Sequence, residues 1–245
     1  MKAFMLVTAA VVLTFAPAAH ADNTLAELTT RLGMIADQAC TDRAAIPPDL
    51  IYEKDAVAAR ARADKGDAYA ENDLGVAYIL GNGVPQDAAA GADLIAKSAA
   101  QDTDVGLQNL GELYHTGLGV PKDDAKAVDL FLRAAAKGAS TTTLALMYCS
   151  GDGVAKDDAT ATYLFAKGGE TGAYFDAYEA GLMLGAGRGA PQNLELAWYF
   201  FSIADHGHHM PQASAARDII APVMTPAQIT AAQRRFAKWQ RNRPY

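Results

Sequence analysis

The chain has 245 residues, of which 21 are Lys or Arg and 28 are Asp or Glu, giving a formal net charge of −7. Binding the phosphate backbone of a nucleic acid requires a basic footprint, so this acidic balance argues against nucleic acid as a partner. Hydrophobic residues make up 51% of the chain, which is enough to build the core of one elongated domain.

Residues 1–21 have the pattern of a cleavable signal peptide. Lys2 gives a positive start, residues 3–15 form an apolar run, and Ala19 and Ala21 provide a small-x-small cleavage signal. The sequence therefore predicts export, with cleavage after Ala21 and a periplasmic or secreted mature protein. The apolar run is too short for a convincing membrane span, and an uncleaved N-terminal anchor is the alternative. The residue directly after the cut is Asp22 and not cysteine, so no lipoprotein anchor is implied.

Residues 22–66 are expected to form an N-terminal helical cap followed by a half-repeat. A helix is predicted over residues 24–40 from the apolar stripe Leu25, Leu28, Leu32 and Ile35. Two prolines at 47 and 48 then break the chain, and residues 55–66 look like the second helix of a repeat whose first helix is missing. Because an array of repeats needs its open apolar end covered, we assign this role to the N-terminal segment.

Residues 67–210 contain one pattern four times. Its clearest copy begins at Leu110-Gly111, continues through Tyr114 to a G-x-G-V-P motif, and ends at Asp123. The first glycine of the G-x-G falls at positions 81, 117, 151 and 187, so the period is 36, 34 and 36 residues. Self-similarity at this period is typical of a solenoid of helix pairs.

Glycines and acids mark the helix boundaries within each copy. The G-x-G is expected to end the first helix through a left-handed glycine, and the Asp or Asn at 87, 123, 157 and 193 to cap the second. Gly111 lies inside the first helix, where glycine costs about 1 kcal/mol relative to alanine. Its presence there predicts that a neighbouring helix crosses closely.

Residues 211–245 are expected to cap the C-terminal end of the array. Thr225 and Gln228 form a capping-box pattern, and Pro226 occupies the first helical position. From residue 226 onward the chain has five basic and no acidic residues. Cations suit the C-terminal end of a helix dipole, and contact with an anionic membrane surface or an acidic partner is the alternative.

The four copies resemble Sel1-like repeats, which are relatives of the tetratricopeptide repeats. Copies one and two follow that pattern, copy three is two residues short between Gly138 and Leu144, and copy four lacks the tyrosine and the valine. The resemblance implies an all-α fold, a right-handed superhelical solenoid of antiparallel helix pairs with helical caps. It also implies a surface that binds other proteins, so the expected function is an interaction adaptor or regulator in the bacterial cell envelope and not an enzyme.

The candidate partner-binding residues are first-helix positions that are expected to be exposed on the concave face of such a superhelix. They are Asn72, Asp73, Ile79, Gln108, Asn109, Glu112, His115, Met147 and Tyr178. Asn109 and Glu112 lie one helical turn apart, so we expect them to clamp the backbone of a bound protein or peptide. The alternative is a solvent-exposed helix face that binds no partner.

The sequence has no motif of nucleophilic, metal or phosphate chemistry, so no catalytic residue, metal or cofactor is expected. His206, His208 and His209 have the side-chain type that binds zinc or copper; the rival interpretation is a solvated loop. The alternative function is a hydrolase acting on cell-wall or β-lactam-like substrates, as resemblance to a cysteine-rich branch of the family implies. That branch pairs cysteines within each repeat, and the two cysteines here share no repeat, which weakens this alternative.

Cys40 and Cys149 are expected to remain separate thiols. An exported chain with two cysteines ordinarily forms a disulfide. However, Cys149 lies in the third repeat and Cys40 precedes the half-repeat, so several helices packed about 8–10 Å apart would separate them. A disulfide requires Cα atoms closer than about 7 Å. The alternative is an N-terminal segment that lies back in the groove as a covalent latch over the partner site.

Overall fold

The computed structural model describes residues 25–43, 56–206 and 210–242, and it contains no β-strand in these ranges. The predicted all-α class is therefore confirmed. The helices are α1 (Leu25–Arg43), α2 (Ala56–Ala63), α3 (Ala68–Leu80), α4 (Ala88–Ala100), α5 (Asp104–Thr116), α6 (Asp124–Ala136), α7 (Thr142–Ser150), α8 (Asp158–Glu170), α9 (Tyr174–Ala186), α10 (Leu194–Ala204), α11 (Pro211–Ile220), the 3-10 helix η2 (Ala221–Val223) and α12 (Pro226–Arg241).

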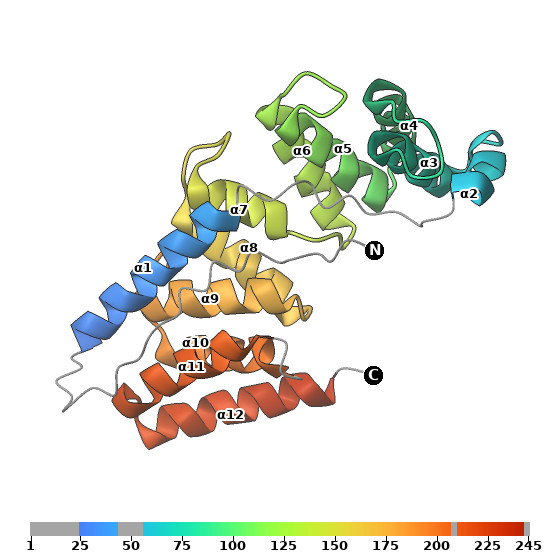
Figure 1. The fold of residues 1–245 in the computed structure, drawn as a ribbon. Coiled ribbons are helices and arrows are strands. Elements are labelled where there is room, and N and C mark those ends of the chain that lie inside the picture. The colour runs from blue at the N-terminus through green and yellow to red at the C-terminus, as the bar shows by residue number, and fades with distance from the viewer. Residues whose placement is uncertain (1–24, 44–55, 207–209, 243–245) are drawn as a thin grey trace.

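Helices α3 to α10 form four antiparallel pairs, one pair for each repeat. In each repeat the first helix packs against the second, as α3 does on α4 and α9 does on α10. Figure 1 shows the pairs following one another from α3 and α4 to α9 and α10 in an elongated, bent array. The predicted solenoid is confirmed, and its right-handedness stays a prediction.

The predicted helix boundaries are also confirmed. The first helices end at glycines in the left-handed conformation, Gly81, Gly117, Gly151 and Gly187, with φ of 68°, 75°, 78° and 70°. The second helices begin at side chains that accept a hydrogen bond from a backbone N–H two or three residues on, Asp87, Asp123, Asp157 and Asn193. Each of these caps also donates its own backbone N–H to a carbonyl near the end of the first helix, such as that of Tyr114 at 2.8 Å.

Two glycines of the repeat allow neighbouring segments to approach closely. A Cβ on Gly111 would lie 2.8 Å from Cε1 of Phe131 in α6, so the predicted close crossing is confirmed. A Cβ on Gly153, the second glycine of its G-x-G, would lie 2.2 Å from Cγ of Asp124 at the start of the preceding repeat's second helix. The G-x-G therefore both ends a helix and packs one repeat against the previous one.

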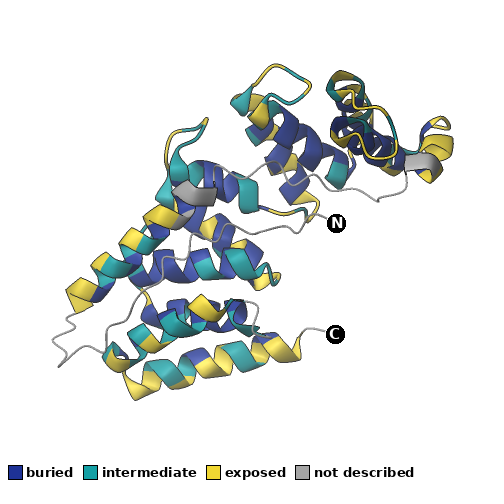
Figure 2. Cartoon of the chain, viewed as in Figure 1, coloured by how far each residue is buried: buried dark blue, intermediate teal, exposed yellow. Residues whose placement is uncertain are grey.

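The buried core runs through the whole array, and α6 joins its two larger clusters. Leu130 and Ala134 of α6 belong to the cluster of repeats one and two, whereas Ala127 and Phe131 belong to the cluster of repeats three and four. Figure 2 shows buried residues passing through the successive helix pairs, while α12 carries many exposed positions.

Helices α11 and α12 pack against α10, the last repeat helix. Both hydrogen bonds of the predicted capping box between Thr225 and Gln228 are present. The indole Nε1 of Trp239 donates to the carbonyl oxygen of Glu170 at 3.0 Å, which ties α12 to the end of α8.

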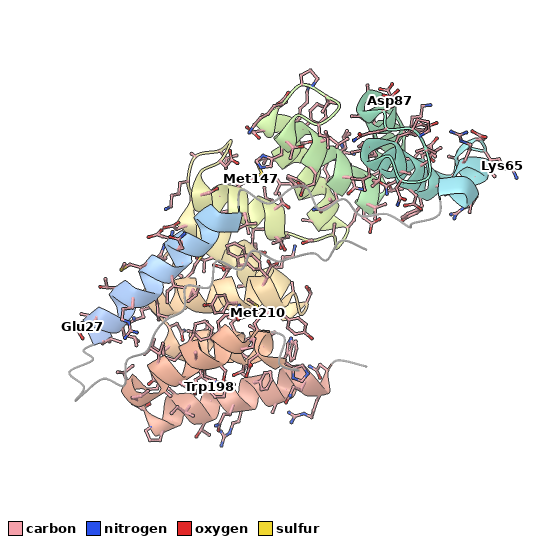
Figure 3. All side chains as sticks on the ribbon, in the orientation of Figure 1. Glu27, Lys65, Asp87, Met147, Trp198 and Met210 are labelled. Atoms are coloured by element: carbon pink, nitrogen blue, oxygen red, sulfur yellow. A yellow bond between two sulfur atoms is a disulfide. The ribbon has the colours of Figure 1, made fainter. Side chains whose placement is uncertain are left out.

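Helix α1 does not cover the N-terminal end of the array. It packs against α9 and α7, and α2 is the helix that packs on α3. Figure 3 places Glu27, near the start of α1, and Lys65, which follows α2, at opposite ends of the molecule. Within the N-terminal segment, α2, the helix of the predicted half-repeat, therefore lies at that end, whereas α1 does not; the division into residues 22–66, 67–210 and 211–245 stays a prediction. An apolar stripe shows that a helix packs, but it does not show against which face.

Candidate functional site

The exposure expected for the nine candidate residues is wrong for seven of them. These seven are at most 7% exposed: Asn72, Asp73, Ile79, Gln108, Asn109, Glu112 and Met147. His115 and Tyr178 are half-buried. Ile79 and Met147 belong to the hydrophobic core. The polar residues are buried because the first helices of neighbouring repeats lie side by side, so that side chains such as Asn72 and Asn109 meet one another instead of solvent.

Hydrogen bonds between these side chains join successive first helices in what we call the polar ladder. Its rungs are Asn109 Nδ2 to Asn72 Oδ1 at 2.8 Å, Thr143 Oγ1 to Glu112 Oε1 at 2.6 Å, and Thr142 Oγ1 to Asp176 Oδ2 at 3.0 Å. Asn109 and Glu112 are thus engaged inside the protein, where they hold repeats one, two and three together. A direct part for them in partner binding stays a prediction.

Gln108 differs from the members of the polar ladder. It is 4% exposed, and its carbonyl Oε1 has no hydrogen-bond partner among the described residues. A buried acceptor without a partner costs about 1–3 kcal/mol. Gln108 therefore lowers the stability of the array and, because its carbonyl oxygen is buried, it is not exposed to a docking chain.

His115 belongs to a cluster of ionisable groups between repeats two and three. Its Nδ1 lies 2.8 Å from Oδ1 of Asp124 and its Nε2 lies 3.6 Å from Oδ2 of Asp152. Lys122 Nζ lies 3.5 Å from Asp124 and 3.8 Å from Asp152. These groups connect the start of α6 with the loop after α7, so His115 acts as a contact between repeats.

Tyr178 lies on α9 with its ring 5.9 Å from that of Phe201. Burial raises the pKa of the phenol well above its ordinary value, and the nearby charge of Glu179 raises it further. Tyr178 therefore stays neutral over the physiological pH range and contributes packing rather than charge.

The remaining candidate cluster, the three histidines after α10, is only partly described. His206 packs edge-on against the rings of Phe236 and Trp239, at 5.9 and 5.6 Å between centroids, whereas His208 and His209 lie outside the described residues. Within the described ranges, no three His, Cys, Asp or Glu side chains are arranged to hold a metal ion.

The surface that α1 covers, which we call the α1 interface, is formed by the C-terminal parts of α7 and α9 and the loops that follow them. Four side chains of α1 at four-residue intervals are buried in it, each at most 2% exposed: Leu28, Leu32, Ala36 and Cys40. Positions four apart share one helix face. Gly185 leaves room for Leu32, because a Cβ there would lie 2.7 Å from the Cδ1 of this leucine.

Polar contacts flank this apolar stripe. Asp37 Oδ1 lies 2.9 Å from Arg188 Nη1 and 3.7 Å from Lys156 Nζ. Gln192 Nε2 donates to Thr29 Oγ1 at 2.7 Å. Asp37 is well exposed, so this ion pair adds little stability; its effect is to fix the position of α1 along the interface.

Cys40 of α1 and Cys149 of α7 form a disulfide with their Cα atoms 5.9 Å apart. The prediction of two separate thiols is therefore wrong, and the segment lies back on the repeats as the alternative required. No helix stands between the cysteines because α1 lies along α7 and α9 instead of covering the end of the array. The spacing places Cys40 on the same stripe as Leu28 and Leu32, which indicates that Cys40 is buried with them but not which cysteine-bearing helix they face.

With this geometry established, the comparisons with known proteins identify the fold. The Sel1 repeat family model matches residues 68–102, 105–138, 144–172 and 176–204, which is more than half of the chain. The chain belongs to the Sel1 repeat family. Its four Sel1 repeats coincide with the helix pairs α3–α4 to α9–α10. Sel1 repeat proteins generally mediate protein–protein interactions.

Two solved structures share the Sel1 repeat fold. The first is c5321, described as a protective antigen present in uropathogenic Escherichia coli strains that displays an SLR fold. It is 27% identical with a TM-score of 0.65, and the match covers 75% of this chain but 40% of c5321. The second is a Sel1 repeat protein from Oxalobacter formigenes, with 20% identity, a TM-score of 0.58 and coverage of 78% and 85%. No curated protein matches the chain.

None of the helices in the described ranges is long and apolar enough to cross a membrane.

Proposed function

We propose that this Sel1 repeat protein is exported and acts as an adaptor or regulator that binds another protein in the bacterial cell envelope. The observation that carries the proposal is the array of four Sel1 repeats, whose first helices are fixed to one another by the polar ladder. A surface that is rigid before binding loses less conformational entropy when a partner docks.

Two features support export. The first 21 residues have the signal-peptide pattern described above. The Cys40–Cys149 bond belongs to a class of cross-link that persists in oxidising compartments such as the periplasm and is rare in the cytosol.

Repeats one and two offer the partner a first-helix surface that α1 does not cover. Tyr69 on α3 is 53% exposed, and its hydroxyl donates to Oδ1 of Asp104 at 3.3 Å. Asp104 and Gln108 lie four residues apart on α5 and share a face. Exposed tyrosine is a common anchor of protein interfaces, and the Asp104 carboxylate fixes the position of this one.

The test is a pull-down from envelope extract with the mature protein, comparing Tyr69→Ser with Tyr163→Ser. Tyr163 is the matched control because it is 66% exposed but lies on α8, a second helix of the array. We expect Tyr69→Ser to lose most of a stoichiometric partner that Tyr163→Ser retains. Equal recovery by both variants would contradict the choice of surface, and no protein recovered by the wild type would contradict the adaptor role.

A further inference from the structure

Helix α1 occupies the repeats in the way a bound peptide does. We infer that the α1 interface is a binding site for an amphipathic helix of another protein, which α1 fills in cis and the Cys40–Cys149 disulfide keeps filled. The form of the chain that accepts the partner is the dithiol form, in which α1 is not covalently held. It is produced by thiol–disulfide exchange with an external dithiol, which becomes a disulfide as Cys40 and Cys149 are reduced. This inference rests on the proposed protein-binding function and specifies a site and the chemistry of its partner.

The buried face of α1 has the shape of a helix docked in a groove. Residues at positions i, i+4, i+8 and i+12 of α1 are the ones buried in the interface, and this is the spacing by which amphipathic helices dock into grooves. The interface presents Gly185 to Leu32 and Ala186 to Gly33, the latter at 3.8 Å between Ala186 Cβ and a Cβ built on Gly33. It therefore selects a leucine followed directly by a small residue.

The α1 interface carries two cationic side chains that favour an acidic residue on the docked helix. The guanidinium of Arg188 is fixed before α1 docks, because Asp158 binds it through Nη2 at 2.8 Å and Nε at 3.3 Å. Arg188 and Lys156 both point their cationic groups at Asp37. A helix that binds here thus carries an acidic residue five positions after the leucine that Gly185 accommodates, in the pattern L-x-x-x-L-G-x-x-A-D of residues 28–37.

Helix α1 contacts the repeats along one side only. Its outer side is open to solvent, with Leu25 47% and Met34 67% exposed, and its main helix contacts are with α9 and α7 alone among the described helices. A helix of this kind is marginal without its docking surface. Docking of α1 is intramolecular in both redox forms. The disulfide makes it covalent and excludes a competitor, whereas without this bond α1 competes only at its effective concentration.

The experiment measures binding of a fluorescent peptide of residues 25–43, with Cys40→Ser, to three forms of the mature protein by anisotropy. The open variant combines Leu32→Glu with Cys40→Ser, which removes α1 from the interface and leaves α7 and α9 unchanged. We expect the open variant to bind with a Kd below about 50 μM, and Cys40→Ser alone to bind roughly 20-fold more weakly, because α1 competes at about millimolar effective concentration. The oxidised wild type should show no saturable binding.

Charge reversal provides the specificity control. A peptide with Asp37→Lys should bind the open variant at least about tenfold more weakly, since it meets Arg188 and Lys156 with a like charge. Adding Arg188→Glu to the open variant should reverse this preference. Circular dichroism first confirms that each variant loses no more helical signal than the 19 residues of α1 supply; if Leu32→Glu lowers it further, Leu32→Ala takes its place.

Three results would overturn the inference: a folded open variant that does not bind the peptide, an oxidised wild type that binds it equally well, or indifference to Asp37→Lys. If Cys40→Ser excludes the peptide as completely as the oxidised wild type does, the disulfide does not control the site. Should the peptide fail while a partner is captured from envelope extract, the adaptor role remains and this inference falls. Should the peptide bind while no partner is captured, the site remains and the adaptor role falls.

Discussion

Replacing both cysteines, as Cys40→Ala with Cys149→Ala, should destabilise the protein severely. The disulfide closes a loop with a sequence separation of 109 residues, and the chain-entropy relation gives about 4.7 kcal/mol for a loop of about 100 residues. Cys40 and Cys149 are at most 2% exposed, so removing their buried sulfur atoms lowers the free energy of unfolding further, by less than the loss of the cross-link does. We therefore expect the free energy of unfolding to fall by about 4–5 kcal/mol.

The assay is urea denaturation of the oxidised wild type and of the double variant, followed by far-UV circular dichroism. Because stability in a repeat array is a sum of neighbour contacts, the loss should fall on the part that α1 contacts. Hydrogen exchange should show faster exchange in α1, α7 and α9 of the variant and unchanged protection in α3 and α4. A loss below about 1 kcal/mol, or equal loss of protection along the array, would refute the reasoning.

Three further predictions follow from single sites. Gly111→Leu should lower the free energy of unfolding by about 1–3 kcal/mol, measured by thermal denaturation, because the leucine side chain would collide with Phe131. The control Gly33→Ala should leave stability unchanged or raise it. An unchanged melting temperature for Gly111→Leu would contradict the close crossing of α5 and α6. The Thr160 hydroxyl, and then its backbone N–H, hold the pKa of Asp157 below 3.8, so this cap stabilises α8 above about pH 4 and is lost as the pH falls below that. Melting at pH 5 and pH 3 should therefore differ less in Asp157→Asn than in the wild type, and an equal difference would show that the cap does not contribute. Gln108→Met should raise the free energy of unfolding by about 1 kcal/mol, because it removes a buried acceptor without a hydrogen-bond partner among the described residues. A lower free energy of unfolding would show that Oε1 is satisfied.

The repeat architecture follows from local rules, and these can be read from the sequence. Gly117 ends a helix because a left-handed residue is needed there, and Asp123 begins the next helix because its carboxylate accepts from Lys126. Each helix end and helix start is thus determined by a few neighbouring residues. Because the same signals recur four times, the order and pairing of α3 to α10 could be predicted.

The candidate site could not be predicted in the same way, because it depends on contacts between distant segments. Asn109 is a polar residue of a type that is usually exposed, but it is buried here because it donates a hydrogen bond to Asn72, which lies one repeat earlier in the chain. Likewise, the stripe of Leu28 and Leu32 predicts a helix without naming Gly185 as its partner. The position of α1, and with it the disulfide, required the three-dimensional arrangement of the repeats.

One measurement tests the central claim most directly, namely that the mature protein is exported with α1 fixed on repeats three and four. The full-length chain is produced in a bacterial cell, purified from the envelope fraction, alkylated without reduction and mapped by mass spectrometry. We expect an N-terminus at Asp22 and a linked peptide containing Cys40 and Cys149. A chain that retains Met1, or one in which both cysteines are alkylated, would contradict it.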